Sequence, residues 1–192
     1  MSNVAIITGA GSGFGLGLAK ELKDLGWVVY ATDRDSVALE KAKEFGAIAR
    51  RMDVTNRADV DAVVKEAIAD QGRIDLMVAN AGFGNFSSVE ETTPEEVRRI
   101  FEVNVFGVEN SIRAVLPQMR KQKSGRIIMT TSVVGHVSLV GLGWYAATKH
   151  SVRAIANALR QEVRALGIKV SVIEPGTVRT NFDSVAFGHL RD

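Results

Sequence analysis

Two residues with complementary proton chemistry lie four positions apart in residues 143–151, which read GWYAATKHS. On a helix, Tyr145 and Lys149 would project from the same face, because four residues make about one turn. Tyrosine titrates near pH ~10, so it exchanges protons at neutral pH only when its pKa is lowered by about 4 kcal/mol of interaction. A lysine ammonium and a second cation in a partly dry cleft would lower it. The same spacing also suits a half-buried tyrosine beside a lysine whose stem covers apolar surface.

A glycine-rich segment follows the first apolar run. Residues 3–8 (NVAIIT) are typical of a buried parallel strand, residues 9–15 (GAGSGFG) of a loop, and residues 16–25 of a helix. A strand, glycine loop and helix in this order directs backbone N–H groups and a helix N-terminus at a phosphate. Glycines also let the backbone approach a pyrophosphate. The segment therefore predicts a dinucleotide-phosphate site, with a plain flexible turn as the alternative.

An acidic residue ends the second expected strand, residues 27–32. Asp33 follows Gly15 by 18 residues, where a carboxylate can accept hydrogen bonds from the ribose 2′-hydroxyl of NAD. Arg34 could instead meet the 2′-phosphate of NADP, but Asp33 would repel that phosphate. We therefore expect NAD, with NADP as the alternative. Asp33 could also cap the next helix, a role that Asp35 or Ser36 fills as easily.

Further strands and helices alternate along the rest of the chain. Strands are expected at residues 47–52, 74–79, 126–131 and 168–173, and helices at 37–45, 59–71, 97–121 and 143–166. The helix at 97–121 is expected to be started by residues 93–96, with Thr93 as N-cap, Pro94 at the first position and Glu96 in a capping box. This alternation predicts an α/β fold, a Rossmann-like doubly wound parallel sheet flanked by helices on both faces. Ligands bind at the carboxyl edge of such sheets. That edge would collect Gly9, Asp33, Asp53, Asn80, Ser132, Pro175 and Gly176. Asn104, inside the helix expected at 97–121, is typical of a local hydrogen bond or a kink.

Length and composition exclude several classes of protein. The 192 residues suffice for one domain, and no second boundary is evident. Cysteine is absent, which excludes disulfides and thiolate nucleophiles, and the three histidines lack metal-ligand spacing. A net charge of +2 without a basic cluster argues against nucleic acid, and no apolar run is long enough for a membrane span. GxSxG and the Walker lysine motif are also missing. We expect a cytoplasmic protein.

Together these motifs resemble the short-chain dehydrogenase/reductase family over residues 3–183. The family motif TGxxxGxG matches Thr8 to Gly15, and NNAG appears as Ala79-Asn80-Ala81-Gly82. The other matches are Asn104, Ser132, the YxxxK pair Tyr145 and Lys149, and Pro175-Gly176. The resemblance implies an NAD(P)-dependent oxidoreductase that transfers a hydride between a nicotinamide and a secondary alcohol or ketone, without a metal.

The resemblance also implies a role for each matched residue. Tyr145 would be the general acid or base, and Lys149 would lower its pKa together with the cationic nicotinamide and bind the nicotinamide ribose. Ser132 would polarise the substrate oxygen, and Asn104 would position a water that relays protons from Lys149. The implied catalytic residues are Asn104, Ser132, Tyr145 and Lys149. The implied cofactor residues are Thr8, Gly9, Gly11, Ser12, Gly13, Phe14, Gly15, Asp33, Arg34, Asp53, Val54, Asn80, Ala81, Gly82, Tyr145, Lys149, Pro175, Gly176 and Thr177. Within this set, Asp53, Val54 and Asn80 would border the adenine side and Thr177 the carboxamide.

The chain departs from the family pattern at its end. Family members usually continue past the position of Asp192 through a substrate-covering segment, a helix and a seventh strand, so we expect a longer native chain. The missing part usually decides the substrate. Residues near the site that predict an apolar alcohol or ketone are His136, Val137, Leu139, Leu142 and Trp144. For His136 itself, we favour a position in a surface loop over contact with the substrate. By analogy, we expect a homodimer through the helices that carry Asn104 and Tyr145.

Two other functions remain open at this stage. A catalytically inactive cofactor-binding regulator or scaffold would keep the fold without turnover, and loss of activity in Tyr145→Phe would exclude it. An epimerase or dehydratase of the related longer group would favour the spacing TGxxGxxG, which this chain lacks.

Overall fold

A single parallel sheet organises the computed structural model, which describes residues 2–176. The strands are β1 (Val4–Thr8), β2 (Val28–Asp33), β3 (Ile48–Arg51), β4 (Leu76–Ala79), β5 (Gly125–Thr130) and β6 (Ile168–Ile173). They pair in the order β3-β2-β1-β4-β5-β6, and every pair is parallel. The order reverses between β1 and β4, which is the switch point where doubly wound sheets bind ligands. The predicted fold class is confirmed.

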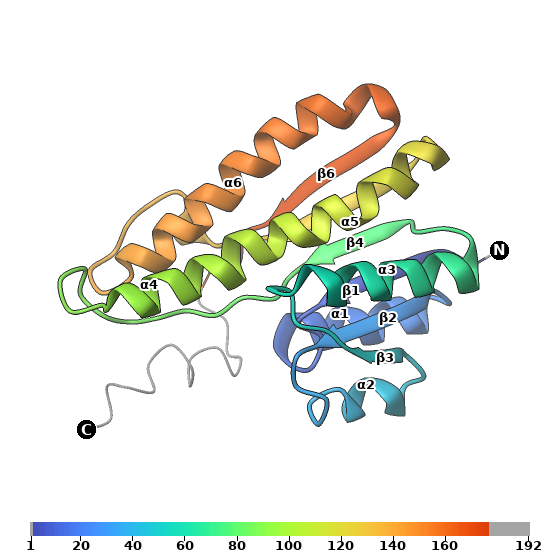
Figure 1. Ribbon diagram of the computed structural model, residues 1–192, viewed down its shortest axis with the longest axis horizontal. Coiled ribbons are helices and arrows are strands. Elements are labelled where there is room, and N and C mark those ends of the chain that lie inside the picture. The colour runs from blue at the N-terminus through green and yellow to red at the C-terminus, as the bar shows by residue number, and fades with distance from the viewer. Residues whose placement is uncertain (1, 177–192) are drawn as a thin grey trace.

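Helices cover both faces of the sheet (Figure 1). On one face lie α1 (Gly13–Asp24) and α2 (Glu40–Glu44); the other face is covered by α3 (Arg57–Gln71), α5 (Gly107–Gln122) and α6 (Gly143–Val163). A further helix, α4 (Pro94–Phe101), precedes α5 and forms one long rod with it beside α6 (Figure 1). None of the helices in residues 2–176 is both long and apolar enough to cross a membrane.

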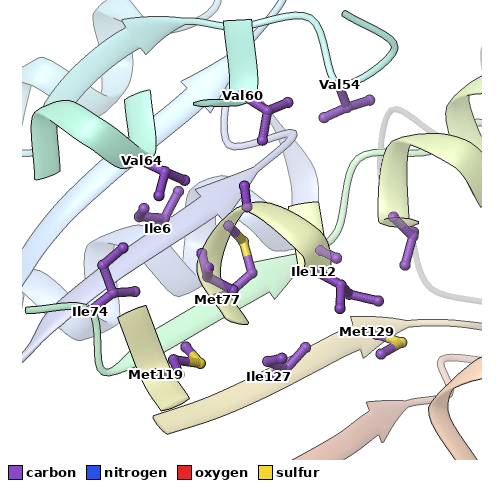
Figure 2. Packing of buried hydrophobic residues seen from close by; sticks show 14 of the residues in the cluster. Ile6, Val54, Val60, Val64, Ile74, Met77, Ile112, Met119, Ile127 and Met129 are labelled. Atoms are coloured by element: carbon purple, nitrogen blue, oxygen red, sulfur yellow. The ribbon is translucent and has the colours of Figure 1, made fainter. Parts of the chain in front are cut away.

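The larger core lies between the sheet and the layer of α3, α5 and α6. Figure 2 shows Ile6, Met77 and Ile127 from three neighbouring strands facing Val64 of α3 and Ile112 of α5. Burial of each such side chain stabilises the fold by about 1.5–3 kcal/mol. All five residues of β1 are buried, because both faces of this central strand are covered. This burial explains why the strand is apolar at every position rather than at alternate ones.

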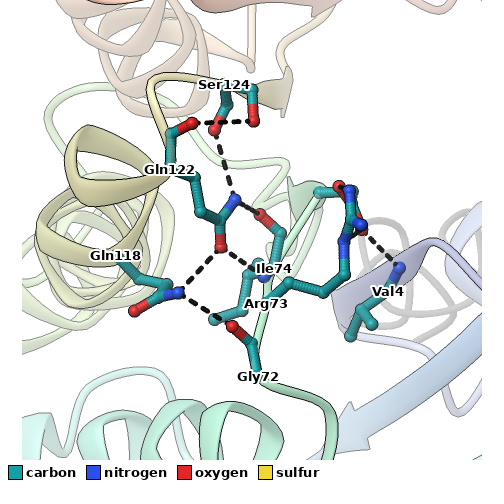
Figure 3. A network of polar contacts seen from close by, with 8 residues as sticks. Val4, Gly72, Arg73, Ile74, Gln118, Gln122 and Ser124 are labelled. Atoms are coloured by element: carbon teal, nitrogen blue, oxygen red, sulfur yellow. Dashed lines mark hydrogen bonds and ion pairs between the residues drawn. The ribbon is translucent and has the colours of Figure 1, made fainter. Parts of the chain in front are cut away.

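A polar network holds the opposite edge of the sheet, where the strands begin (Figure 3). The carboxamide of Gln122, in α5, accepts a hydrogen bond from Ile74 N–H at 2.9 Å and donates one to Ile74 O at 2.9 Å. The carboxylate of Asp75 accepts hydrogen bonds from Val4 N–H at 2.8 Å and from the guanidinium of Arg73. These contacts tie α5, β1 and the start of β4 together, and so fix the strands whose other ends form the site.

The long helix expected at residues 97–121 is interrupted, which corrects the prediction of one continuous helix. Its start at Pro94 is the predicted one: Thr93 Oγ1 accepts from Glu96 N–H at 3.3 Å, and the Glu96 carboxylate accepts from Thr93 N–H at 2.8 Å. Between α4 and α5, residues 102–106 then form a π-helical segment that contains Asn104. Single-turn π segments occur mostly inside α-helices and often at functional sites.

Candidate active site

A cavity of about 790 Å³ opens at the carboxyl edge of the sheet. Most of the predicted site residues line this cavity, and they come from segments in both halves of the sheet. These residues are Gly9, Ser12, Gly13, Phe14, Asp33, Arg34, Asp53, Val54, Asn80, Ala81, Gly82, Ser132, Tyr145, Lys149, Pro175 and Gly176. Four other predicted residues are placed behind this wall and hold it: Thr8, Gly11, Gly15 and Asn104. Thr177 lies outside the described residues.

The glycine loop packs closely enough to leave the N-terminus of α1 facing the cavity. Gly9 has φ +66°, a left-handed conformation that side chains disfavour, and a Cβ on Gly15 would collide with the Gly9 carbonyl oxygen. Ser12 precedes the helix without a side-chain cap, so the first N–H groups of α1 keep their hydrogen-bonding capacity for another partner. Thr8 holds the neighbouring segment, because its hydroxyl accepts from Asn80 N–H and Ala81 N–H, both at 2.9 Å. This geometry suits an anionic phosphate.

The carboxylate of Asp33 lies between the glycine loop and the cavity. It accepts hydrogen bonds from Gly11 N–H at 3.1 Å and from Asp35 N–H at 3.0 Å. The alternative that Asp33 caps the next helix is wrong, because the N-cap of α2 is Leu39, which makes no side-chain cap hydrogen bond. Asp35 accepts from Val37 N–H at 2.9 Å in the turn before α2. A carboxylate offers about four acceptor positions, so Asp33 retains capacity for a ligand on the cavity side.

A second acidic side chain, Asp53, stands across this end of the cavity. Burial raises its pKa, but hydrogen bonds from Thr55 and the positive charges of Arg34 and Arg51 outweigh burial and hold the pKa below its ordinary value. Asp53 is therefore a carboxylate at neutral pH. Its negative charge interacts with the positive charge of Arg34. The electrostatic balance at this end is mixed, with acidic and basic groups side by side.

The two residues with complementary proton chemistry meet as predicted, on one face of α6. Lys149 is buried, its Nζ donates to Thr130 O at 3.0 Å, and the same Nζ lies 5.5 Å from the centroid of the Tyr145 ring. Ser132, two residues after the end of β5, reaches the same place: its hydroxyl donates to Pro175 O at 3.4 Å and hydrogen-bonds to Tyr145. Three groups able to bind or transfer a proton thus surround one corner of the cavity.

Burial is the largest cause of the pKa shifts of Tyr145 and Lys149. Burial raises the pKa of Tyr145 to about 12, and the hydrogen bond from Ser132 opposes it only in part. Burial also lowers the pKa of Lys149 to about 8. In the protein groups alone, loss of hydration is the largest cause of the shift at Tyr145, and the charge of Lys149 is not among the causes. The lowering expected from Lys149 together with a cationic nicotinamide stays a prediction. Sequence spacing places the pair but does not reveal how dry its surroundings are.

Asn104 makes three hydrogen bonds outside its own helix, not the local one that its helical position suggested. Its Oδ1 accepts from Phe83 N–H at 3.0 Å, and its Nδ2 donates to Phe83 O at 2.9 Å and to Thr148 Oγ1 at 3.1 Å. Both amide hydrogens are thereby used. A relay water, as the family resemblance implies, would have to meet the remaining acceptor capacity of Oδ1, which faces Gly82. The relay remains a prediction.

The sequence predicted only some of the apolar residues that line the cavity. Leu139 and Leu142 line the cavity as expected, and they are joined by Phe83, Val103 and Val134. The position of Phe83 directly after the Asn80-Ala81-Gly82 motif was the signal that could have revealed it. The guanidinium of Arg99 lies 5.4 Å from the centroid of the Phe83 ring, at the same cavity.

Three other residues expected near the site face elsewhere within the described part of the chain. His136 Nε2 lies 2.9 Å from a carboxylate oxygen of Glu174, and Trp144 donates to Val89 O at 3.4 Å. Val137 is 53% exposed. The prediction that Val137 and Trp144 line the site is therefore wrong, whereas His136 is the surface-loop histidine that the sequence favoured.

The fold and this cavity define a Rossmann-like dinucleotide-binding protein, and comparison with known proteins gives its family. Residues 3–188 match the sequence profile described as short chain dehydrogenase. The chain belongs to the short-chain dehydrogenase/reductase family. A curated relative, the 3-ketodihydrosphingosine reductase of Bacteroides thetaiotaomicron, is 38% identical over 180 residues, which cover 93% of this chain and 65% of the relative. The chain thus spans just under two thirds of the length of that relative.

Solved structures of the family agree with the fold and differ in cofactor. A short chain dehydrogenase/reductase from Burkholderia phymatum in complex with NAD has a TM-score of 0.91 and 32% identity, with 100% of this chain and 70% of that chain covered. An alcohol dehydrogenase from Thermococcus sibiricus complexed with 5-hydroxy-NADP has a TM-score of 0.89 and 30% identity, with 97% and 81% covered. These relatives support a nicotinamide cofactor of either kind.

Proposed function

We propose that this protein is an NAD(P)-dependent oxidoreductase that interconverts a secondary alcohol and a ketone. The observation that carries the proposal is the meeting of Ser132, Tyr145 and Lys149 at one corner of the cavity whose other walls include the glycine loop and Asp33. A phosphate-binding helix end and a proton-transferring corner in one cavity are what a dinucleotide-dependent reaction on a C–O group requires.

The residues present fit a nicotinamide dinucleotide. The close packing of Gly9 and Gly15 leaves the α1 N-terminus open to a pyrophosphate, and Asp33 keeps acceptor capacity for a ribose. We favour NAD, because the Asp33 carboxylate would repel a 2′-phosphate, and because Arg34 acts on Asp53. When bound, the cofactor supplies or accepts the hydride at the carbon of the substrate.

Tyr145 then handles the proton. With its pKa raised to about 12, Tyr145 is protonated at neutral pH and can give its proton to the carbonyl oxygen while Ser132 holds that oxygen. The lowered pKa of Lys149, about 8, lets this residue hand a proton back to Tyr145 near neutral pH. For the reverse reaction, Tyr145 must lose its proton first, which requires cations next to the phenolate. The apolar part of the wall, with Phe83, Leu139 and Leu142, favours an apolar substrate.

The proposal is tested by cofactor binding and by turnover. NADH and NADPH are titrated separately into the chain while their fluorescence is followed, and NADH oxidation is then measured with a panel of apolar ketones. We expect tighter binding of NADH, turnover by the wild type, and loss of turnover with retained NADH binding in Tyr145→Phe. Binding without turnover of any ketone by the wild type would favour the inactive cofactor-binding regulator instead.

A homodimer through the helices that carry Asn104 and Tyr145 is also part of the proposal. The rod of α4 and α5 lies beside α6 (Figure 1), and Phe106, within this rod, is 51% exposed. A second copy would cover such an apolar side chain. Sedimentation equilibrium that finds only monomers at micromolar concentrations would contradict this assignment.

A further inference from the structure

The hydroxyl of Thr148 lies between the two proton-handling residues of α6 and is fully buried. Thr148 Oγ1 donates to Tyr145 O at 2.7 Å and accepts from Asn104 Nδ2 at 3.1 Å. A threonine hydroxyl has one hydrogen, and the bond to the Tyr145 carbonyl uses it. Thr148 can therefore meet Asn104 only as an acceptor.

The other bonds of Asn104 make this acceptor necessary. Phe83 N–H requires an oxygen, so Asn104 Oδ1 must face it, and one Nδ2 hydrogen is then directed at Phe83 O. The second Nδ2 hydrogen points toward α6, where Thr148 receives it. Asn104 is only 1% exposed, so water does not replace this partner easily. Thr148, Asn104 and Phe83 thus form one hydrogen-bonded chain across three segments.

Each segment in this chain carries part of the site. Thr148 lies on the helix of Tyr145 and Lys149, Asn104 in the π segment, and Phe83 in the cavity wall, where it packs against the cluster that contains Tyr145. A shift of the Asn104 amide would therefore move Phe83 relative to Tyr145. Displacements of about 1 Å are enough to reduce catalysis strongly.

We propose that Thr148 is a positioning residue for the reaction, which acts through Asn104 to hold Phe83 and Tyr145 in register. The inference rests on the proposed oxidoreductase function. Thr148 itself touches neither substrate nor cofactor in this assignment. Thr148 contributes a single acceptor oxygen. A residue of the same shape without that oxygen should therefore no longer position Asn104.

The experiment compares three substitutions on α6. Thr148→Val keeps the shape and removes the hydroxyl, Thr148→Ser keeps the hydroxyl, and Ser151→Ala removes a similar bond, Ser151 Oγ to Ala147 O at 2.9 Å, that lies outside the chain. We expect kcat to fall about tenfold in Thr148→Val, the equivalent of about 1.4 kcal/mol, with the dissociation constant of NADH nearly unchanged. Thr148→Ser should restore most of the activity, and Ser151→Ala should equal the wild type.

A double substitution tests whether Thr148 acts through Asn104. In an Asn104→Ala background, Thr148→Val should cost nothing further, because the two residues then share one lost interaction. If the kcat losses of Asn104→Ala and Thr148→Val multiply in the double variant, the inference is overturned. An unchanged kcat in Thr148→Val would also overturn it, as would a loss of kcat in Thr148→Ser as large as that in Thr148→Val. If Thr148→Val does not fold, Thr148→Ala removes the same oxygen with a smaller side chain.

A readout without turnover separates this inference from the proposed function. In ¹⁵N-labelled protein, the side-chain amide signals of Asn104 should shift and exchange faster in Thr148→Val, and should stay unchanged in Ser151→Ala. Unchanged Asn104 signals in Thr148→Val would overturn the inference even if no ketone is turned over by the wild type. Shifted signals together with absent turnover would retain the hydrogen-bonded chain and contradict the oxidoreductase function alone.

Discussion

Replacing Lys149 by methionine should remove activity and yet make the folded protein more stable at pH 7. Burial lowers the pKa of Lys149 from 10.5 to about 8, which means that the folded state disfavours its ammonium by about 3 kcal/mol. Methionine fills a similar volume without a charge but gives up the hydrogen bond from Nζ to Thr130 O, at a cost of about 1 kcal/mol. The net expected gain in the free energy of unfolding is about 2 kcal/mol.

The pH dependence of this gain gives the sharper test. A folded-state pKa below the unfolded one means that between pH 8 and 10.5 the unfolded chain binds more protons at Lys149, so wild-type stability rises with pH in that window. Lys149→Met lacks this component. The advantage of the variant should therefore shrink by about 2 kcal/mol between pH 7 and pH 9.5.

Urea unfolding followed by circular dichroism measures both quantities. Lys65→Met serves as the control, because Lys65 is exposed on α3. The free energy of unfolding of this variant should stay within about 0.5 kcal/mol of the wild-type value at every pH. If Lys149→Met is less stable than the wild type at pH 7, or if its advantage does not change with pH, then burial does not dominate the energetics of Lys149 and the reasoning fails.

Two further substitutions test the frame around the site. Gly15→Ala should weaken NADH binding by about tenfold or more, because the added Cβ collides with the Gly9 carbonyl and displaces the α1 N-terminus, and fluorescence titration measures this. An unchanged affinity would mean that the loop does not hold the pyrophosphate. Gln122→Met should lower the free energy of unfolding by about 1–3 kcal/mol, because the Ile74 N–H and C=O both lose their partner (Figure 3), while NADH affinity stays the same. A loss of affinity as large as that in Gly15→Ala would show that the far edge of the sheet controls the site.

Much of the fold was predictable because local sequence carries its signals. Continuous apolar runs predicted the six strands, since strands of a parallel sheet are buried on both faces. The glycine loop between a strand and a helix predicted a helix N-terminus open to a phosphate, and the close packing of Gly9 and Gly15 agrees with it. The carboxyl ends of parallel strands share one edge, so Asp33, Asn80 and Ser132 could be placed around one cavity before any coordinates were known.

Other features depend on contacts between distant parts of the chain, and no local pattern contains them. Asn104 bonds to Phe83, 21 residues away, and to Thr148, 44 residues away, and this pairing was missed when the helix was taken as continuous. His136 likewise pairs with Glu174, which is 38 residues away.

The protonation chemistry was decided by tertiary structure as well. Spacing alone placed Tyr145 beside Lys149 and suggested that the ammonium would lower the tyrosine pKa. The fold instead buries both groups, raising the pKa of Tyr145 to about 12 and lowering that of Lys149 to about 8. Spacing along a helix is a local property, whereas hydration is lost only when other segments pack around the pair. For this reason the sequence by itself determined which residues meet, and only the folded structure determined which of them carries a proton.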